Sequence, residues 1–380
     1  MRLLLINYEY PPVGGGAANA TANIARAMSL LGHEVLVLTA NYAARPSRST
    51  DGNVTVLRVR APRKRTDRSN LFEMGAFVAS AAFSLPGILR SEAPDGAVVF
   101  FSLPCGPLGL LGQSWAKLPY VISLRGGDVP GTESSMAALY KWLAPIRRLV
   151  LRRSIAVVAN SASLKRLSEA TDPIPVDVIP NGVDTDFYVP ARRPPDSPFT
   201  FLFVGRFQNQ KNLPFLLDGI AALRKRSSVP FRLVMVGDGP LHGPMHSRCV
   251  SLGLDDVVTW HGWCAKSELV EHYGNADCFL NPSLFEGMPN TVLEAMACGL
   301  PVIASDVVGN DATVLDGGTG YLINLARPDE FVAAMRALLE NPSRAKALGA
   351  AGRQRTVGDF SWESVARSYV YLFSRAKHAG

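Results

Sequence analysis

The chain has 380 residues, of which 47% are apolar and 19% are charged. This balance excludes a disordered chain, and the length suggests two domains of ordinary size. The five cysteines are scattered without a CxxC pair or another metal-ligand spacing, which favours reduced, buried thiols in a cytoplasmic protein. The sequence has no helix-turn-helix pattern, zinc spacing or aromatic–basic RNA-binding stretch, so we expect no nucleic-acid partner.

Positive charge is concentrated in the first part of the chain. Residues 1–170 contain 20 Lys and Arg against 10 Asp and Glu, a balance of +10, and the remainder has a balance of −3. The basic residues gather at 45–68 and 147–153. A one-sided basic surface attracts an anionic lipid, a nucleic acid or a phosphorylated substrate, although a solvated face without a partner is an equally good interpretation.

Two apolar segments could be mistaken for membrane or targeting signals. The N-terminal run is short and leads into Asn-Tyr-Glu-Tyr without a small-residue cleavage site, so it does not read as a signal peptide. Residues 71–89 are strongly apolar, but Glu73, Gly75 and Pro86 interrupt them. We therefore expect a packed helix there rather than a membrane span.

Short apolar runs alternate with helix-length segments along the whole chain, which predicts βαβ units and parallel sheets. The predicted strands are residues 2–7, 34–39, 54–60, 97–102, 120–124 and 155–159, followed by 200–206, 231–237, 257–262, 277–282 and 301–305. The proline-rich stretch between the two sets reads as a linker over 181–198. We thus predict an α/β protein with two doubly wound Rossmann-like domains, residues 1–180 and 199–360, facing a central cleft. The last segment, 361–380, is predicted to be a helix that packs back on the N-terminal domain.

In such folds, ligands bind beyond the carboxyl ends of the strands. A glycine run, Gly14, Gly15 and Gly16, follows the first strand and opens a helix, where bare backbone amides can approach an anion. It lacks both the GxGxxG spacing and the P-loop lysine, so neither an NAD fingerprint nor a Walker motif is present. A flexible strand–helix turn is the alternative interpretation.

Two cations follow the first strand of the second domain in the segment FVGRFQNQKN. Arg206 and Lys211 lie five residues apart across a strand-to-helix turn. Arginine offers a planar fork and lysine a point charge, a combination that suits a diphosphate. Two solvated surface cations would have the same sequence pattern.

The segment FEGMPNTVLEAMACGL places one carboxylate before a helix and one inside it. Gly287 and Pro289 keep Glu286 in a loop, Asn290 is a good N-cap, and Glu294 lies about one turn into the helix. Backbone amides can donate to a phosphate group, and carboxylates can accept from sugar hydroxyls, so together they would suit a phosphorylated sugar ligand. A loop charge and a helix-dipole partner are the alternative roles. The predicted ligand-binding residues between the two glutamates are Gly287, Met288, Pro289 and Asn290.

The 29 residues PSLFEGMPNTVLEAMACGLPVIASDVVGN resemble the signature of the retaining glycosyltransferases of family 4 (group 1), which have the GT-B fold. GHEVLVLT, the glycine run, PNGVD and VGRFQNQKN resemble the same family in the same order. The resemblance implies that Glu294 binds the nucleotide ribose, Glu286 lies by the donor sugar, and Arg206 and Lys211 hold the diphosphate. It implies that Gly15 and Gly16 face the phosphates from the other domain. It also places the base near Gly237, His261 and Trp263. A turn glycine at 237 and a core histidine at 261 are the alternative interpretations.

One position departs from the family pattern. Many members carry a histidine after the strand equivalent to YVISL, where this chain has Arg125, with Asp128 nearby. Arginine stays protonated and cannot act as a base. We expect Arg125 to contact a phosphate or an acidic sugar group, and Asp128 to contact acceptor or sugar or to cap a turn.

The resemblance implies transfer of a sugar, with retention, from a UDP- or GDP-sugar to an acceptor hydroxyl. No DxD-type pair follows a strand, so we expect positive side chains in place of a metal and no cofactor. The resemblance implies that the N-terminal domain binds the acceptor. Its positive charge predicts a glycan or lipid-linked acceptor in cell-envelope glycan synthesis, and a cytoplasmic enzyme that visits the anionic inner face of the membrane. A soluble acceptor with a merely basic domain is the alternative. A nucleotide-sugar 2-epimerase of the same fold and a non-catalytic nucleotide-sugar-binding module are the alternatives.

Overall fold

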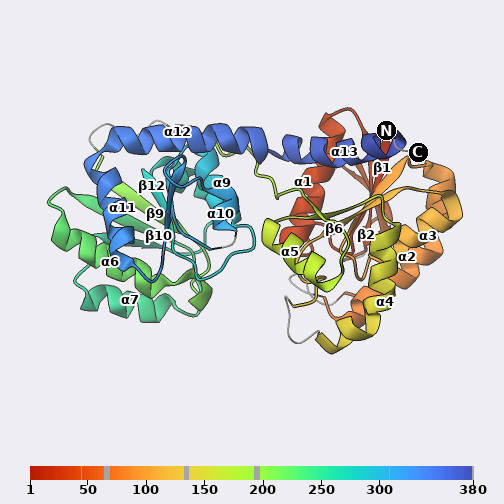
Figure 1. Ribbon diagram of the computed structural model, residues 1–380, viewed down its shortest axis with the longest axis horizontal. Helices are drawn as coiled ribbons and strands as arrows, with labels where there is room; N and C mark the ends of the chain where they lie inside the picture. Colours follow the sequence, from red (N-terminus) through yellow and green to blue (C-terminus); the bar gives the residue numbers. More distant parts are fainter. Residues whose placement is uncertain (44, 64–68, 132–136, 192–196, 308, 379–380) are drawn as a thin grey trace. The chain divides into compact units, whose positions relative to one another are not determined.

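The computed structural model describes residues 1–43, 45–63, 69–131, 137–191, 197–307 and 309–378 (Figure 1). The chain forms two compact units. Unit 1 consists of Met1–Gly182 together with Trp362–Gly380, and unit 2 is Val183–Ser361. Most of the stretch expected to be a linker therefore belongs to unit 2, where Val183 forms a β-bridge with Ser361.

Unit 1 is built on an eight-stranded sheet in the order β3-β4-β2-β1-β5-β6-β7-β8. All neighbouring strands are parallel except β3, which pairs antiparallel with β4. The central strands are apolar runs buried on both faces, as expected of a parallel sheet covered by helices. The strands are β1 (Arg2–Ile6), β2 (Glu34–Ala40), β3 (Arg48–Asp51), β4 (Val54–Val59), β5 (Gly96–Phe100), β6 (Tyr120–Leu124), β7 (Ala156–Ala159) and β8 (Asp177–Val178).

The described residues of unit 1 form six α-helices, and Figure 1 shows helices on both sides of the sheet. α13 packs against α1, α2 packs against α3, and α3 packs against α4. The helices are α1 (Gly16–Leu30), α2 (Leu71–Glu92), α3 (Gly106–Ala116), α4 (Ala137–Arg153), α5 (Ala162–Thr171) and α13 (Trp362–His378).

α2 covers the apolar stretch at 71–89 as one continuous helix that includes Pro86. Asn70 caps it by accepting from the Glu73 amide, while the Glu73 carboxylate accepts from the Asn70 amide. By length and composition alone it could cross a membrane. In the structure it packs on the sheet through a stripe of side chains spaced by four, as predicted for a packed helix. The stripe consists of Glu73, Phe77, Ala81, Leu85 and Leu89.

Unit 2 is built on a six-stranded, fully parallel sheet in the order β11-β10-β9-β12-β13-β14. The strands are β9 (Phe199–Val204), β10 (Phe231–Val236), β11 (Val258–His261), β12 (Cys278–Asn281), β13 (Val302–Ser305) and β14 (Gly320–Ile323). The helices are α6 (Leu213–Arg226), α7 (His242–Ser251), α8 (Lys266–Gly274), α9 (Asn290–Ala297), α10 (Asn310–Thr313), α11 (Pro328–Glu340) and α12 (Pro342–Asp359).

Both sheets change direction next to their first strand. In unit 1 the chain moves outward from β1 through β2 and then returns to β5, and in unit 2 it moves outward from β9 through β10 and returns to β12. Loops that leave neighbouring strands in opposite directions open a crevice at the carboxyl edge of the sheet. Two Rossmann-like α/β sheets are thus present, as predicted, and each has a site-forming crevice of its own.

Candidate functional site

The crevice of unit 2 carries the first predicted site. Arg206 follows β9, and Glu286 lies in the loop that follows β12, so the two residues come from neighbouring strands on either side of the change in direction. Lys211 ends the 3₁₀ turn Asn209–Lys211, which leads into α6. The fold therefore brings two cations and a carboxylate to one edge of the sheet.

Lys211 and Glu286 form an ion pair. Lys211 Nζ lies 2.6 Å from Glu286 Oε1, and the two side chains are only 13% and 7% exposed. The two segments are joined by backbone contacts as well. The Leu284 amide donates to the Gln210 carbonyl oxygen, and Gln210 Nε2 donates to the Phe285 carbonyl oxygen, both at 2.8 Å. Because these bonds fix both segments, the ion pair is preformed.

Arg206 is exposed at the same edge. Among the described residues Arg206 has no ion-pair partner, so its charge is uncompensated, whereas Glu286 balances the charge of Lys211. An incoming diphosphate would meet a free guanidinium first and the paired ammonium beside it. The arrangement suits an anion whose charge increases during a reaction.

Buried polar side chains hold the loop that carries Glu286. Ser283 Oγ donates to Asn281 Oδ1, Asn281 Nδ2 donates to Asn310 Oδ1, and Asn310 Nδ2 donates to the Ser305 carbonyl oxygen, each at 3.0 Å. All four residues are fully buried. Our sequence reasoning missed them, and the available signal was a polar residue at the carboxyl end of an apolar strand, where Asn281 ends β12 and Ser305 ends β13.

The backbone between Glu286 and α9 is packed against a glycine that the sequence analysis also missed. Gly309 has a φ of +97°, and a Cβ there would lie 2.8 Å from the Gly287 carbonyl oxygen. Only glycine fits at this position without moving the loop. The predicted N-cap is wrong: Asn290 is the first residue of α9, and buried Pro289 occupies the cap position. Met288 is half-buried and Gly287 is exposed.

Glu294 lies in α9 and is half-buried. The hydroxyl of the buried Tyr273 donates to Glu294 Oε2 at 2.9 Å. Burial raises the pKa of Glu294 above its ordinary value, while the hydrogen bond from Tyr273 opposes the rise. Tyr273 therefore both fixes the direction of this carboxyl group and favours its ionised form.

The other predicted residues of unit 2 follow β10 and β11. Gly237 has a φ of +134°, and a Cβ would lie 2.0 Å from the Gly205 carbonyl oxygen, so the ends of β9 and β10 can approach closely only with glycine here. Its amide donates to the carbonyl oxygens of His261 and Gly262. His261 is exposed, and Trp263 is 81% exposed. An exposed indole at the carboxyl edge is available for stacking on a flat ligand.

In unit 1 the glycine run lies between β1 and α1. Gly15 is the N-cap of α1 and Gly16 its first residue, both are exposed, and a Cβ on either would meet no atom within 4 Å. Gly14 instead packs tightly, because a Cβ added there would lie 2.6 Å from Glu9 Oε2. Glu9 in turn accepts from Arg63 Nη2 at 3.2 Å. The run thus presents amides at a helix N-terminus.

Arg125 is held within unit 1. Its Nη1 donates to Asn181 Oδ1 at 2.8 Å, its Nη2 donates to the Tyr369 hydroxyl at 3.2 Å, and its guanidinium lies 4.9 Å from the centre of the Phe100 ring. Nε is buried without a hydrogen-bond partner among the described residues. The ligand contact expected from the sequence would require Arg125 to leave some of these partners.

Asp128 is fully buried and has the contacts of a turn-capping residue. Its carboxylate accepts from the amides of Ser102 at 2.6 Å and Arg125 at 3.0 Å. Burial raises the pKa of Asp128, and these hydrogen bonds oppose the rise. The side chain therefore fixes the turn after β6 rather than bordering solvent.

Comparison with known proteins agrees with this architecture. Residues 15–182 match the family model described as "Glycosyl transferase 4-like domain", and residues 198–341 match "Glycosyl transferases group 1". A glycogen synthase of Mycobacterium tuberculosis is 28% identical over 399 residues, which cover 99% of this chain and 95% of that protein. The UDP-Gal:alpha-D-GlcNAc-diphosphoundecaprenol alpha-1,3-galactosyltransferase of Escherichia coli is 30% identical over 266 residues, which cover 66% of this chain and 68% of that protein.

Among solved structures, the sucrose-phosphate synthase of Thermosynechococcus elongatus matches with a TM-score of 0.76 at 22% identity, over the full length of both chains. The fold is that of the GT-B glycosyltransferases. The chain belongs to the group 1 glycosyltransferases. The sequence motifs therefore correctly predicted a glycosyltransferase with the GT-B fold.

Proposed function

We propose that the protein is a retaining, metal-independent glycosyltransferase that uses a UDP- or GDP-sugar as donor. The observation that carries this proposal is the Lys211–Glu286 ion pair beside the uncompensated Arg206, at the crevice of the unit 2 sheet. Family membership supports sugar transfer, and the name of the Escherichia coli relative includes UDP-galactose as donor.

In the proposed reaction the bond between the anomeric carbon and the donor diphosphate breaks, and the acceptor oxygen bonds to the same face of the sugar. The acceptor proton passes to a phosphate oxygen of the departing diphosphate, so no protein nucleophile is required. Arg206 and Lys211 stabilise the negative charge that grows on the leaving group. The backbone amides of Gly287, Met288 and Asn290 are further donors. Glu286 holds Lys211 in place and lies by the sugar, and Glu294 accepts from the ribose hydroxyls.

Two lines of support point to a lipid-linked or polysaccharide-precursor acceptor in cell-envelope synthesis. The acceptor in the name of the Escherichia coli relative is a sugar diphosphate on undecaprenol. In addition, α4 carries exposed apolar side chains at spacings of four and three, namely Trp142, Ile146 and Leu149, which are 79%, 45% and 48% exposed. We propose that this stripe lies on the cytoplasmic face of the membrane.

Basic side chains accompany the stripe. The exposed Arg148 lies on one flank of α4 but pairs with Asp172. At 100° per residue, Lys141 and Arg152 fall on the same flank, and both are exposed. Each is worth about 1 kcal/mol near an anionic leaflet, so the helix could attach reversibly. Arg147 does not contribute to this surface, because it is buried and paired with Asp172.

A panel of donor sugars, with and without candidate acceptors, tests the proposal. We expect one UDP- or GDP-sugar to release nucleoside diphosphate only when an acceptor is present, to give a product with the anomeric configuration of the donor, and to react equally in a chelator. Donor turnover without acceptor would identify an epimerase or hydrolase. Binding without turnover under all conditions would identify a binding module.

A further inference from the structure

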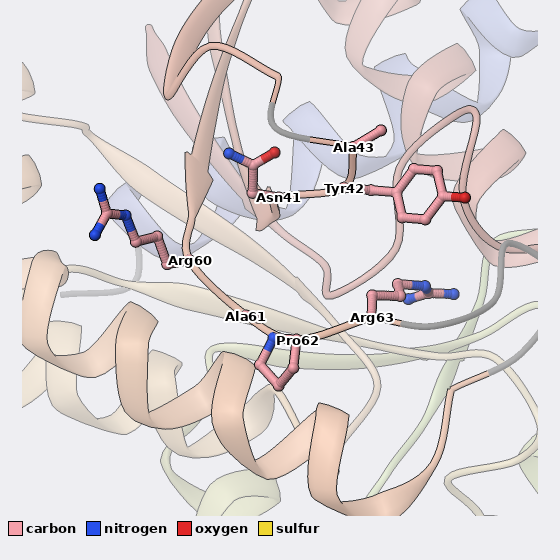
Figure 2. Close-up of a pocket in the computed structure, with 7 residues that line it drawn as sticks. All are labelled: Asn41, Tyr42, Ala43, Arg60, Ala61, Pro62 and Arg63. Atoms are coloured by element: carbon pink, nitrogen blue, oxygen red, sulfur yellow. The ribbon is translucent and has the colours of Figure 1, made fainter.

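Unit 1 contains a cavity of about 410 Å³ at the carboxyl ends of β2 and β4. The Asn41 amide donates to the Val59 carbonyl oxygen at 2.8 Å and so joins the two segments that form its walls. Figure 2 shows Arg60 and Arg63 at the two ends of one wall, with Asn41 and Tyr42 on the other. The lining residues are Asn41, Tyr42, Ala43, Arg60, Ala61, Pro62 and Arg63.

The charge of this cavity is unbalanced. Arg63 is only 3% exposed and pairs with Glu9, so its charge is compensated. Arg60 is exposed, and among the described residues no carboxylate is paired with it. One guanidinium in the wall is therefore free to form a bidentate pair with an anion.

The neutral wall offers a hydrogen-bond acceptor. Asn41 Nδ2 donates to the Arg45 carbonyl oxygen at 2.8 Å, which leaves Asn41 Oδ1 buried without a hydrogen-bond partner among the described residues. A buried acceptor of this kind is costly unless a donor reaches it. A ligand hydroxyl, admitted by a small rotation of the side chain, would supply that donor.

The cavity is linked to the glycine run through Glu9. Glu9 follows β1, at the change in strand direction, and contacts Arg63 on one side and the Gly14 position on the other. Because the carboxyl ends of parallel strands meet at one edge of a sheet, the cavity shares this edge with the exposed Gly15 and Gly16 at the start of α1.

We propose that this cavity binds a phosphate group of the acceptor, with Arg60 as its ion-pair partner and Asn41 accepting from a neighbouring hydroxyl. The proposal rests on the transferase function, because it assigns the anchored molecule the role of acceptor. The phosphate can belong to a soluble phosphorylated sugar or polyol, or to the headgroup of a lipid.

The test compares ligands that contain a phosphate monoester with partners that lack one. Glycerol 1-phosphate is titrated against glycerol by calorimetry, with excess UDP or GDP present to fill the donor site. For the lipid source, dihexanoyl phosphatidic acid is compared with dihexanoyl phosphatidylcholine below their micelle concentrations. We expect at least one phosphate compound to bind about tenfold or more tightly than its matched partner, as a charge-assisted hydrogen bond predicts. If the affinity difference is larger for the soluble pair, the acceptor is a soluble phosphorylated compound. If it is larger for the lipid pair, the acceptor phosphate belongs to a lipid headgroup.

Three variants locate the effect. Arg60→Gln should abolish the preference for phosphate, Arg60→Lys should keep part of it, and Arg90→Gln, which changes an exposed arginine of α2, should keep all of it. An unchanged thermal midpoint and unchanged nucleotide affinity show that Arg60→Gln is folded. A phosphate preference that survives in Arg60→Gln, or that is absent from the wild type, overturns the proposal. Failure to bind any nucleotide, with the Arg60-dependent preference intact, would instead refute the donor assignment.

Discussion

Lys211 and Glu286 are 75 positions apart in the sequence, yet they form one of the most enclosed ion pairs of unit 2, at 2.6 Å. Their meeting depends on β9 lying next to β12 in the sheet. Lys211 therefore already has an anionic partner before any donor binds. A bound diphosphate would have to compete with Glu286 for Lys211 or share Lys211 with it. Lys211 would therefore stabilise the diphosphate most strongly in the transition state, when the negative charge of the diphosphate increases.

Replacing Lys211 by alanine should reduce kcat about 10²–10³-fold, as is common when one charge-stabilising contact is lost. It should also destabilise unit 2 by about 1–3 kcal/mol, because Glu286 loses its partner in an enclosed position. Arg206→Ala should lower kcat similarly and leave the thermal midpoint unchanged, since Arg206 is exposed. Steady-state kinetics and thermal unfolding separate the two effects, with Arg224→Ala as a distant control. Near-normal rates in both variants would refute the diphosphate assignment.

Nucleotide affinity should depend on the protonation of Glu294. If the ribose hydroxyls donate to the ionised carboxylate, as proposed, affinity for UDP or GDP should fall as the pH is lowered through the raised pKa of Glu294. This transition should occur at a higher pH than for an exposed glutamate. Tyr273→Phe removes the hydrogen bond that opposes the rise and should move the transition to still higher pH.

Calorimetric titrations between about pH 4 and 8 provide the measurement. Glu294→Gln is the control. It should bind the nucleotide more weakly and lack the pH transition of Glu294, but it should keep the pH transition that comes from the nucleotide phosphate. Identical pH profiles for the wild type and Glu294→Gln would show that Glu294 does not contact the nucleotide.

Arg125→Ala should mainly destabilise unit 1. It removes hydrogen bonds to Asn181 and Tyr369, worth about 1–3 kcal/mol together, and each kcal/mol lowers the thermal midpoint by about 2–4 °C in a domain of this size. Below the transition, kcat should stay close to that of the wild type. Arg90→Ala is the matched control. A large loss of kcat without a change in thermal midpoint would instead show that Arg125 contacts donor or acceptor.

Binding to anionic vesicles should depend on the exposed stripe of α4. We expect the wild type to sediment with anionic vesicles more than with neutral ones, and less so at high salt. Trp142→Ser together with Ile146→Ser should weaken this binding at least tenfold, because two apolar side chains no longer insert. Leu30→Ser, at an 85% exposed position of α1, should have no effect. Failure of the wild type to bind anionic vesicles at low salt would refute the membrane proposal and leave the transferase proposal intact.

The sequence was sufficient to predict the strands that form the two sheet centres, since these are unbroken apolar runs. It did not predict β3, β8 or β14. β3 has the polar sequence RSTD, β8 has two residues, and both are short strands toward the edge of the sheet, where packing imposes little pattern. β14 is likewise an edge strand, of four residues.

The residue types of the unit 2 site could be predicted, but their pairings could not. Arg206 and Lys211 follow a recognisable strand end, whereas the partner of Lys211 is set by strand order. The same holds for Arg125, whose contact with Tyr369 spans 244 positions. The buried chain of Asn281, Ser283, Ser305 and Asn310 was missed because its pairings join segments that are distant in the sequence, although Asn281 and Ser305 each stand at the polar end of an apolar strand.

The last described helix, α13, has a consequence for biosynthesis. Val365, Ala366, Tyr369, Leu372 and Phe373 belong to the core of unit 1, Phe373 packs on Gly96 of β5, and the Tyr369 hydroxyl lies 2.8 Å from Ser123 Oγ. This helix emerges from the ribosome only after all of unit 2. We therefore expect the core of the nascent unit 1 to stay incomplete, with an apolar face accessible to chaperones, until unit 2 has been translated. Unit 2 is contiguous in sequence and can complete its core first.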